Sequence, residues 1–289
     1  MFEISGKTRV YGILGDPVSH SLSPVMQNMA MKAAGLDAVY LPFHVTPQDL
    51  SAAVEGLRAL RVGGVNITLP HKQQIIHLLD RVDADATLIG AVNTVVRYEA
   101  ELIGFNTDGL GFIRSLQEDV GFVPAGKRVL LLGAGGACRA AAVALLRSGV
   151  NNLSIVNRNK ARAEQLIERI SAVFPAQRIR AHGFGDAGYL NDLERADLVV
   201  NTTSIGLKGE EISFCPLAKV KASASIYDMV YSLAETPFVR VAKARGLVAA
   251  DGLGMLAGQG EEAFYKWFDF RPQNGLMKTC LQRMCAKNS

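Results

Sequence analysis

Short apolar runs alternate with amphipathic stretches along most of the chain, a pattern typical of an α/β protein with a mainly parallel sheet. The clearest run covers residues 129–132, and an Ala-rich stretch of helical character follows it to residue 146. In such a fold we expect the ligand crevice at the carboxyl ends of the strands. The pattern predicts strands at 8–14, 39–45, 63–68, 90–97, 102–104, 129–132, 153–156, 178–182, 197–201, 225–228 and 247–250.

Apolar residues with helical spacing occur between these runs. Leu50, Val54 and Leu57 recur on one face of a stretch that starts at Pro47. Pro24 suits the first position of another helix. The same criteria predict helices at 24–34, 47–60, 71–79, 108–116, 237–245, 255–268 and 276–285.

A glycine-rich turn separates the run at 129–132 from the Ala-rich helix, with Gly at 133, 135 and 136. Strand, glycine turn and helix in this order form the context of a dinucleotide-binding fingerprint. The glycines let the backbone turn sharply and approach a pyrophosphate, which sits on the helix N-terminal amides. The motif GAGGAC is a variant, with Ala or Cys where the third fingerprint Gly falls. A tight turn without a ligand and a methyltransferase-type cofactor loop are the alternatives.

The end of the next strand distinguishes between nucleotide cofactors. A fold that binds NAD usually carries an acid about 20 residues after the glycines, to hold the ribose hydroxyls. Here that position is Asn157, and Arg158, Lys160 and Arg162 follow it. Guanidinium groups at this place suit a 2′-phosphate, which favours NADP over NAD and over a methyltransferase cofactor. A solvated basic loop is the alternative reading.

Composition and charge limit the classes of protein to which the chain can belong. Of 289 residues, 49% are apolar and 20% are charged, as in soluble globular proteins. The net charge of +4 is mild, and no basic run suggests nucleic acid. No apolar run reaches the ~20 residues of a membrane span, and the first ten residues lack a signal-peptide core. The four Cys form no CxxC pair and the five His show no metal-ligand spacing. We therefore expect a cytoplasmic protein without a metal.

Two charged residues lie where strands are predicted to end. Lys72 follows the strand at 63–68, and Asp108 closes the segment GFNTD. A buried lysine can take the proton of an alcohol as hydride leaves, while a neighbouring carboxylate holds its ammonium form. A solvated lysine and a helix N-cap are equally good readings for each residue taken singly.

Several polar residues are also candidates for ligand contacts. Ser21 and Ser23 can both donate to one carboxylate, although Ser23 also suits a helix cap. Asn66, Thr68 and Asn93 interrupt apolar strands, so they serve either structural hydrogen bonds or a ligand. For Gln259, in an apolar helix, and Tyr231, after a strand, the residues alone do not separate a structural role from a binding role.

Nine short motifs follow one another along nearly the whole chain. They are GDPVSHSLSP (15–24), NITLPHK (66–72), GAVNT (90–94), GFNTDG (104–109), LLGAGGACRA (131–140), NRNKAR (157–162), NTTSIG (201–206), YDMVY (227–231) and DGLGMLAGQG (251–260). Each is weak to moderately specific alone, but in this order and spacing they are highly specific. The chain resembles the shikimate dehydrogenase family, including its quinate/shikimate members.

The resemblance implies a reversible, NADP-dependent oxidation of shikimate to 3-dehydroshikimate, which runs the other way in aromatic amino acid (chorismate) biosynthesis. It implies Lys72 and Asp108 as the catalytic pair, and Ser21 and Ser23 as ligands of the substrate carboxylate. The residues implied at the ring hydroxyls are Thr68, Asn93 and Gln259, with Tyr231 close by. Those implied at the cofactor are Gly133, Ala134, Gly135, Gly136, Ala137, Asn157, Arg158 and Arg162, with Met229 and Gly252 bordering the nicotinamide.

The resemblance also implies a discontinuous domain organisation. An N-terminal α/β substrate domain (1–107) precedes a Rossmann-type NADP-binding domain (108–254). The C-terminal helices (255–289) return to the substrate domain. We expect a small-molecule enzyme that is a monomer or a homodimer.

One departure from the family pattern keeps two other functions open. The usual SPxxHN continuation has Gln27 in place of His, as in some quinate/shikimate relatives. A quinate/shikimate dehydrogenase with broader substrate and cofactor use is therefore an alternative. A non-catalytic NADPH-binding regulatory module is another, although an intact Lys72 and Asp108 pair argues against it.

Overall fold

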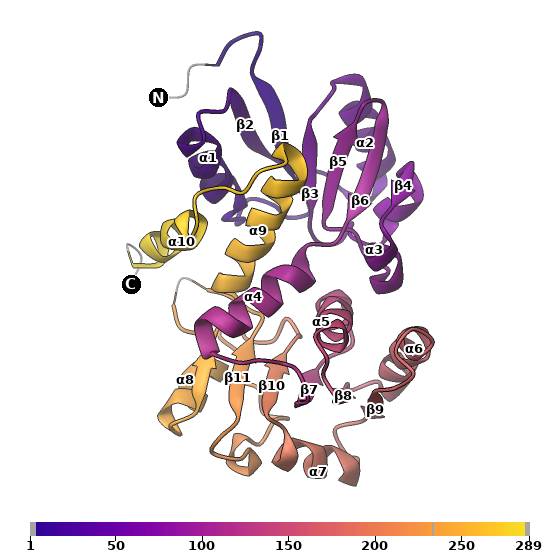
Figure 1. The fold of residues 1–289 in the computed structure, drawn as a ribbon, viewed down its shortest axis with the longest axis vertical. Helices are drawn as coiled ribbons and strands as arrows, with labels where there is room; N and C mark the ends of the chain where they lie inside the picture. The colour runs from indigo at the N-terminus through magenta and orange to yellow at the C-terminus, as the bar shows by residue number, and fades with distance from the viewer. Residues whose placement is uncertain (1–3, 233, 287–289) are drawn as a thin grey trace. The chain divides into compact units, whose positions relative to one another are not determined.

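The computed structural model describes residues 4–232 and 234–286, and the chain divides into two compact units. Unit 1 comprises Met1–Gly111 and Leu256–Arg283. Unit 2 comprises Phe112–Met255 and the chain from Met284 onward. Each unit is built around one six-stranded sheet (Figure 1). A C-terminal segment thus completes the N-terminal unit.

The sheet of unit 1 has the strand order β2-β1-β3-β5-β6-β4. β1 lies parallel to both neighbours, whereas β5 is antiparallel to β3 and β6. The β5–β6 connection spans two residues, which suffices for a hairpin but not for a parallel crossover. The strands are β1 (Arg9–Gly15), β2 (Ala38–His44), β3 (Gly64–Ile67), β4 (Arg81–Val82), β5 (Thr94–Tyr98) and β6 (Glu101–Phe105).

Helices cover the sheet of unit 1 with apolar faces. The Leu50, Val54 and Leu57 face predicted from spacing is buried in a core with β3 and β5. Trp267 packs against the rings of Tyr11 and Tyr40 and donates to the Val95 carbonyl at 3.0 Å. The helices are α1 (Ser23–Ala33), α2 (Leu50–Ala59), α3 (Ala84–Ile89), α9 (Leu253–Phe268), α10 (Leu276–Ala286), and the 3-10 turns Pro47–Asp49 and Gln74–Leu78.

Several predicted boundaries in unit 1 were wrong. The stretch 71–79 forms only a 3-10 turn, and α1 begins at Ser23 with Leu22 as its N-cap, so Ser23 is not the cap. Helix α3 was missed, although Asp83 accepts from the Asp85 amide at its start. Gly90 is the left-handed C-cap of α3 (φ 69°) and does not begin a strand.

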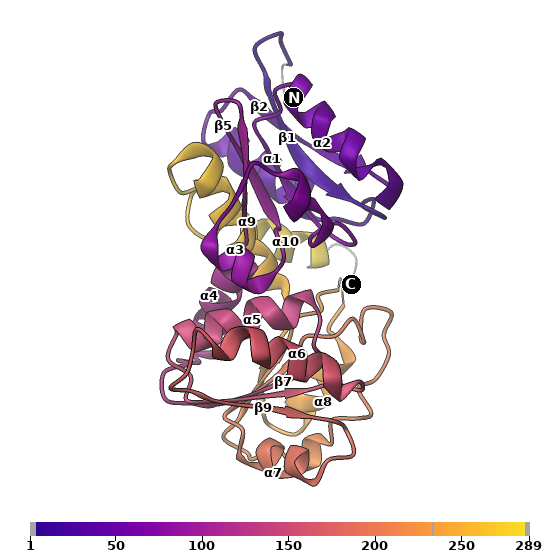
Figure 2. The same ribbon diagram turned by 90° about the vertical axis from the view of Figure 1, so that its right-hand side faces the viewer.

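The sheet of unit 2 is parallel throughout, in the order β12-β11-β10-β7-β8-β9. The order reverses between β7 and β10, which is where such sheets bind ligands. The α7 and α8 helices share one core with β7 and β10, and α5 and α6 lie on the opposite face (Figure 2). The elements are α4 (Asp108–Val120), β7 (Arg128–Leu132), α5 (Gly136–Arg147), β8 (Asn152–Val156), α6 (Lys160–Ser171), β9 (Arg178–His182), α7 (Ala187–Arg195), β10 (Leu198–Asn201), a 3-10 turn (Leu217–Lys219), β11 (Ser225–Asp228), α8 (Pro237–Ala244) and β12 (Val248–Ala250).

Candidate active site

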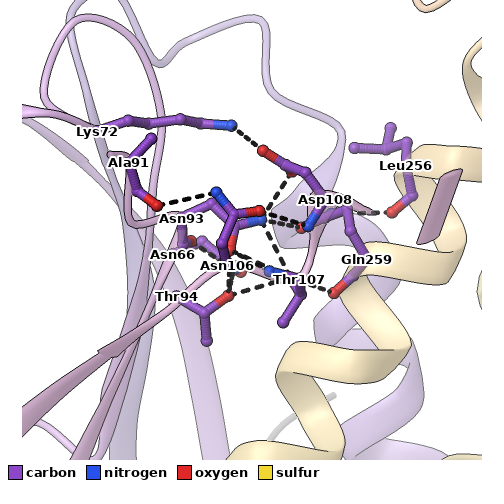
Figure 3. Close-up of polar contacts among 10 residues, drawn as sticks. All are labelled: Asn66, Lys72, Ala91, Asn93, Thr94, Asn106, Thr107, Asp108, Leu256 and Gln259. Atoms are coloured by element: carbon purple, nitrogen blue, oxygen red, sulfur yellow. Dashed lines mark hydrogen bonds and ion pairs between the residues drawn. The ribbon is translucent and has the colours of Figure 1, made fainter. Parts of the chain in front are cut away.

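Lys72 and Asp108 form an ion pair within unit 1. The Lys72 Nζ lies 2.7 Å from Asp108 Oδ2, and the two side chains are 25% and 12% exposed (Figure 3). The main chain fixes the lysine, because the Lys72 carbonyl accepts from the Val92 amide at 2.8 Å. The two residues are 36 positions apart, so the fold creates the pair. Partial exposure leaves the ammonium accessible to a small molecule.

Asn93 connects this pair to a buried polar network. Its Nδ2 donates to Asp108 Oδ1 at 2.7 Å and to Thr107 Oγ1 at 3.0 Å. Its Oδ1 accepts from the Thr107 amide at 2.8 Å. Asn93 is 2% exposed, and leaving such an amide unpaired would cost about 1–3 kcal/mol. The network therefore fixes the orientation of the Asp108 carboxylate.

Asn106 and Tyr40, which the sequence did not single out, and Asn66, which it did, form a second layer of hydrogen bonds around the network. Asn106 accepts from the Asp108 amide at 3.1 Å and donates to the Ala91 carbonyl at 2.9 Å. Burial raises the pKa of Tyr40, so its hydroxyl stays protonated and donates to Asn66 Oδ1 at 2.7 Å. Asn66 in turn donates to the Asn93 carbonyl. The polar positions in apolar strands were the sequence signal for this layer.

Gln259 joins the network from α9. Its Oε1 lies 3.5 Å from Asn93 Nδ2, and its Nε2 donates to the Leu256 carbonyl at 2.9 Å (Figure 3). Thr107 Oγ1 also donates to the Gln259 carbonyl. The structure thus brings Gln259 to Asn93 across 166 positions of sequence. The next residue, Gly260, accepts from the fully buried Gln27 Nε2 at 2.9 Å, and Gln27 Oε1 has no partner.

Ser21, Ser23 and Thr68 follow the carboxyl ends of β1 and β3, which are neighbouring parallel strands. The Ser23 amide donates to Ser21 Oγ at 3.2 Å, which leaves the Ser21 hydroxyl proton free to reach a ligand. The Thr68 amide donates to the Leu14 carbonyl. A Cβ at Gly15 would lie 2.4 Å from Thr68 Cγ2, so glycine allows Thr68 this position. All three are in the same unit as Lys72.

Unit 2 carries the glycine loop at its switch point. Gly133 has φ +109°, and a Cβ there would lie 2.9 Å from Thr202 Oγ1. A Cβ built at Gly135 or Gly136 would meet no atom within 4 Å, so the start of α5 is open to a ligand. The loop, with Ala134 and Ala137, therefore presents helix N-terminal amides to an anion.

Arginines near this loop have unused hydrogen-bonding capacity. Arg139, in the first turn of α5, has a buried Nε without a partner. Arg158 and Arg162 are exposed and have no ion pair in the described ranges, whereas Lys160 pairs with Asp186 at 3.0 Å. Asn157 donates to the Asn159 carbonyl. The donor set fits a phosphorylated dinucleotide, and Arg139 is a member that the sequence analysis missed.

The loop after β11 is held by Asp228. Its Oδ1 accepts from Asn201 Nδ2 at 2.8 Å and from the Val230 amide at 3.1 Å, while its buried Oδ2 has no partner. Burial raises the pKa of Asp228 to about 6. A Cβ at Gly252 would lie 2.3 Å from the Met229 carbonyl oxygen, so only glycine fits against this loop.

The predicted site residues thus fall in both units. Tyr231, Met229 and Gly252 belong to unit 2, and burial raises the pKa of the Tyr231 phenol. Lys72, Asp108 and the other predicted substrate ligands belong to unit 1. Among residues 4–232 and 234–286, no cluster of His, Cys, Asp and Glu is arranged to hold a metal ion. No helix in these ranges is long and apolar enough to span a membrane.

A dinucleotide loop in one unit and a paired lysine and carboxylate in the other indicate a nicotinamide-dependent dehydrogenase of a small hydroxylated compound. Comparisons with known proteins agree. Residues 13–95 match the family model for the shikimate dehydrogenase substrate binding domain, and residues 117–206 match that for shikimate / quinate 5-dehydrogenase. The chain belongs to the shikimate dehydrogenase family.

Individual relatives are similar over nearly their whole length. Shikimate dehydrogenase (NADP(+)) of Geobacter metallireducens is 50% identical, with 96% of each chain covered. The structure of shikimate 5-dehydrogenase from Thermus thermophilus in complex with NADP(H) and shikimate is 36% identical, with a TM-score of 0.85, and 96% of this chain and all of that chain are covered. Quinate dehydrogenase from Corynebacterium glutamicum, in complex with NAD, is 29% identical with a TM-score of 0.87, and 96% and 99% are covered.

Proposed function

We propose that this protein catalyses the reversible, NADP-dependent oxidation of shikimate to 3-dehydroshikimate, with Lys72 and Asp108 as the proton-transfer pair. The observation that carries the proposal is the 2.7 Å contact between Lys72 Nζ and Asp108 Oδ2, next to the Asn93 network. Family membership and the relatives named for NADP and shikimate support the same reaction.

In the proposed mechanism, bound NADP⁺ supplies the hydride acceptor. In its neutral form, Lys72 would take the hydroxyl proton while the hydride leaves the same carbon for the cofactor, so the alcohol becomes a ketone. The ammonium that forms would later release this proton to water. Asp108 holds the lysine side chain in place and stabilises its charged form after the transfer. Asn93 keeps the second carboxylate oxygen occupied, which leaves Oδ2 directed at the lysine.

The substrate would be held by neutral donors around this pair. Ser21 and Ser23 suit the carboxylate, and Thr68 and Gln259 suit ring hydroxyls, with Tyr231 close by. The N–H groups of Asn93 already reach Asp108 and Thr107, so this amide would contact a hydroxyl only by exchanging one of those bonds. For this reason we propose that Asn93 mainly positions the Asp108 carboxylate.

The cofactor would lie on unit 2. The amides of Ala134, Gly135, Gly136 and Ala137 would receive the pyrophosphate. The Gly133 amide donates to the Val156 carbonyl at 2.7 Å, so Gly133 would border the cofactor without donating to it. Arg158 and Arg162, beside Asn157, would receive the 2′-phosphate. Met229 and Gly252 would border the nicotinamide. We further propose a cytoplasmic enzyme that works as a monomer or a homodimer, a state that sedimentation velocity measures.

A quinate/shikimate dehydrogenase with broader cofactor use is the second candidate, favoured by Gln27. The deciding experiment measures kcat/KM for shikimate and for quinate, each with NADP⁺ and NAD⁺. We expect the highest value for shikimate with NADP⁺, because a relative named shikimate dehydrogenase (NADP(+)) is 50% identical, whereas the quinate dehydrogenase is 29% identical. Equal or higher values for quinate would transfer the assignment to the second candidate. NADPH binding without oxidation of either acid would indicate a regulatory module instead.

A further inference from the structure

Unit 2 contains a second polar recess, at the edge of its sheet opposite the cofactor loops. Four arginines border this recess of about 90 Å³: Arg128, Arg178, Arg180 and Arg195. Arg128 and Arg178 begin strands β7 and β9. Each of these parallel strands is five residues long and rises about 3.3 Å per residue. The recess at their amino ends therefore lies roughly 16 Å from their carboxyl ends, where the cofactor loops begin. The recess is therefore separate from the cofactor site.

Strand register makes the arginines converge. Arg128 pairs with Asn152, and Asn152 pairs with Arg178, so the three form one row across neighbouring strands. Leu130 lies two residues after Arg128 in β7, so both side chains are on the same face of the sheet. Leu130 belongs to the core that α7 covers, so this is the face that α7 packs against. The α7 helix ends at Arg195, which closes the recess from the helix side. The fold thus holds these cations together, although they are up to 67 positions apart in the sequence.

The carboxylate that lines the recess is already neutralised. Asp192 accepts from Ser154 at 2.6 Å, from His182 at 2.9 Å and from Arg180 at 3.2 Å. Burial acts to raise the pKa of Asp192, but these hydrogen bonds and the Arg180 charge outweigh it and lower the pKa below its ordinary value. Asp192 therefore stays ionised, and Arg180 is its counter-ion.

The neighbouring carboxylates have cations of their own. Glu194 pairs with Lys219 at 3.0 Å, and Asp197 pairs with Lys221. The carbonyl end of α7 contributes only about half a negative charge. Within the described part of the chain, no ion pair joins the guanidinium groups of Arg128, Arg178 and Arg195 to a carboxylate. Three positive charges are left facing one small recess.

From this arrangement we infer that the recess binds a phosphate group, either as free inorganic phosphate or as the end of a phosphomonoester. A recess of about 90 Å³ has room for several waters, and therefore for one tetrahedral oxyanion. Guanidinium groups bind phosphate through paired, charge-assisted hydrogen bonds. Asn152 and Ser154, which also line the recess, add polar groups at its wall.

Isothermal titration calorimetry of the full-length protein tests this site. Sodium phosphate is titrated at low ionic strength with just enough NADP⁺ to saturate the cofactor loops, so that no large excess of its 2′-phosphate competes for the recess. Arg178→Gln and Arg195→Gln should each weaken phosphate binding at least about fivefold. The matched control is Arg240→Gln, which removes the same charge from an exposed position on α8. It should change the affinity less than about twofold.

Titration with phenyl phosphate distinguishes the two sources of the group. Similar affinities for both anions support a phosphomonoester site, and binding of inorganic phosphate alone supports a site for the free anion. Equal losses of phosphate affinity in all three variants would mean that only the net charge of the protein matters, and this would overturn the proposal. The absence of any phosphate binding to the NADP⁺-saturated wild type would overturn it as well. Thermal unfolding of each variant verifies that the fold is intact.

Discussion

Replacement of Lys72 by Ala should lower kcat for shikimate oxidation by about 10²–10⁴-fold, the usual worth of a positioned acid–base group. At about 1.36 kcal/mol per tenfold, this is about 3–5 kcal/mol of transition-state free energy. The fold should survive, because Asn93 still holds Asp108 Oδ1 and water can fill the space that the lysine side chain leaves beside Oδ2. The NADPH dissociation constant should not change, since the glycine loop belongs to unit 2.

A second variant separates proton transfer from charge. Lys72→Arg keeps the positive charge, but a guanidinium does not release its proton at working pH. If Lys72 transfers the proton, the arginine variant should be nearly as slow as the alanine variant. Lys32→Ala, at an exposed position of α1, is the matched control and should retain wild-type kcat. The assay follows NADPH absorbance in steady state and in a single turnover.

Two results would refute this reasoning. Near-normal kcat in Lys72→Ala would remove the lysine from proton transfer. Near-normal kcat in Lys72→Arg, with loss in Lys72→Ala, would reduce its role to electrostatic binding. A loss of NADPH affinity in either variant would point to misfolding, which circular dichroism and thermal unfolding measure directly.

Further predictions concern the cofactor, the substrate side and stability. Arg158→Ala should lower kcat/KM for NADP⁺ roughly ten- to a hundredfold and leave that for NAD⁺ nearly unchanged; equal losses would exclude a 2′-phosphate role. Gln27→Met removes the bond to Gly260 and should raise the shikimate KM about two- to tenfold at constant NADP⁺ KM; a constant shikimate KM would contradict this. Because the pKa of Asp228 is raised to about 6 in the folded state, its stabilisation is lost as pH rises through that value. The free energy of unfolding of wild type, relative to Asp228→Asn, should therefore fall by up to about 3 kcal/mol between pH 4 and 7 in denaturant titrations. A difference that does not change with pH would show that folding does not raise the pKa of Asp228. Gly252→Ala should lower the melting temperature, because the added Cβ overlaps the Met229 carbonyl; an unchanged value would contradict the tight contact.

The sequence alone predicted the local features that depend on pattern and special residues. The glycine turn after 129–132 and the basic residues after the next strand lie where the fingerprint places them. The α3 helix was missed because it is six residues long and shows little periodicity, although Asp83 and Gly90 mark its ends. The antiparallel hairpin β5–β6 was likewise not distinguished from parallel strands, since periodicity does not report strand direction.

The polar network could be predicted only in part. Lys72, Asp108, Asn93 and Gln259 were singled out by motif, but local pattern does not reveal that residues up to 187 positions apart make one network. No pattern in the sequence singled out Thr107, and only the fold shows that its amide donates to Asn93. Long-range contacts of this kind depend on the order of the strands in the sheet and on the return of α9 to the N-terminal unit. The type of residue at a single position determines neither.

Isotope transfer tests the central claim most directly. Shikimate carrying deuterium at the carbon whose hydroxyl becomes the ketone is incubated with NADP⁺ and the enzyme, and the reduced cofactor is analysed by mass spectrometry. The proposed mechanism predicts one deuterium in every NADPH formed, and formation of this labelled cofactor about 10²–10⁴-fold more slowly with Lys72→Ala. Reduced cofactor without deuterium, or no reduced cofactor from shikimate at all, would contradict it.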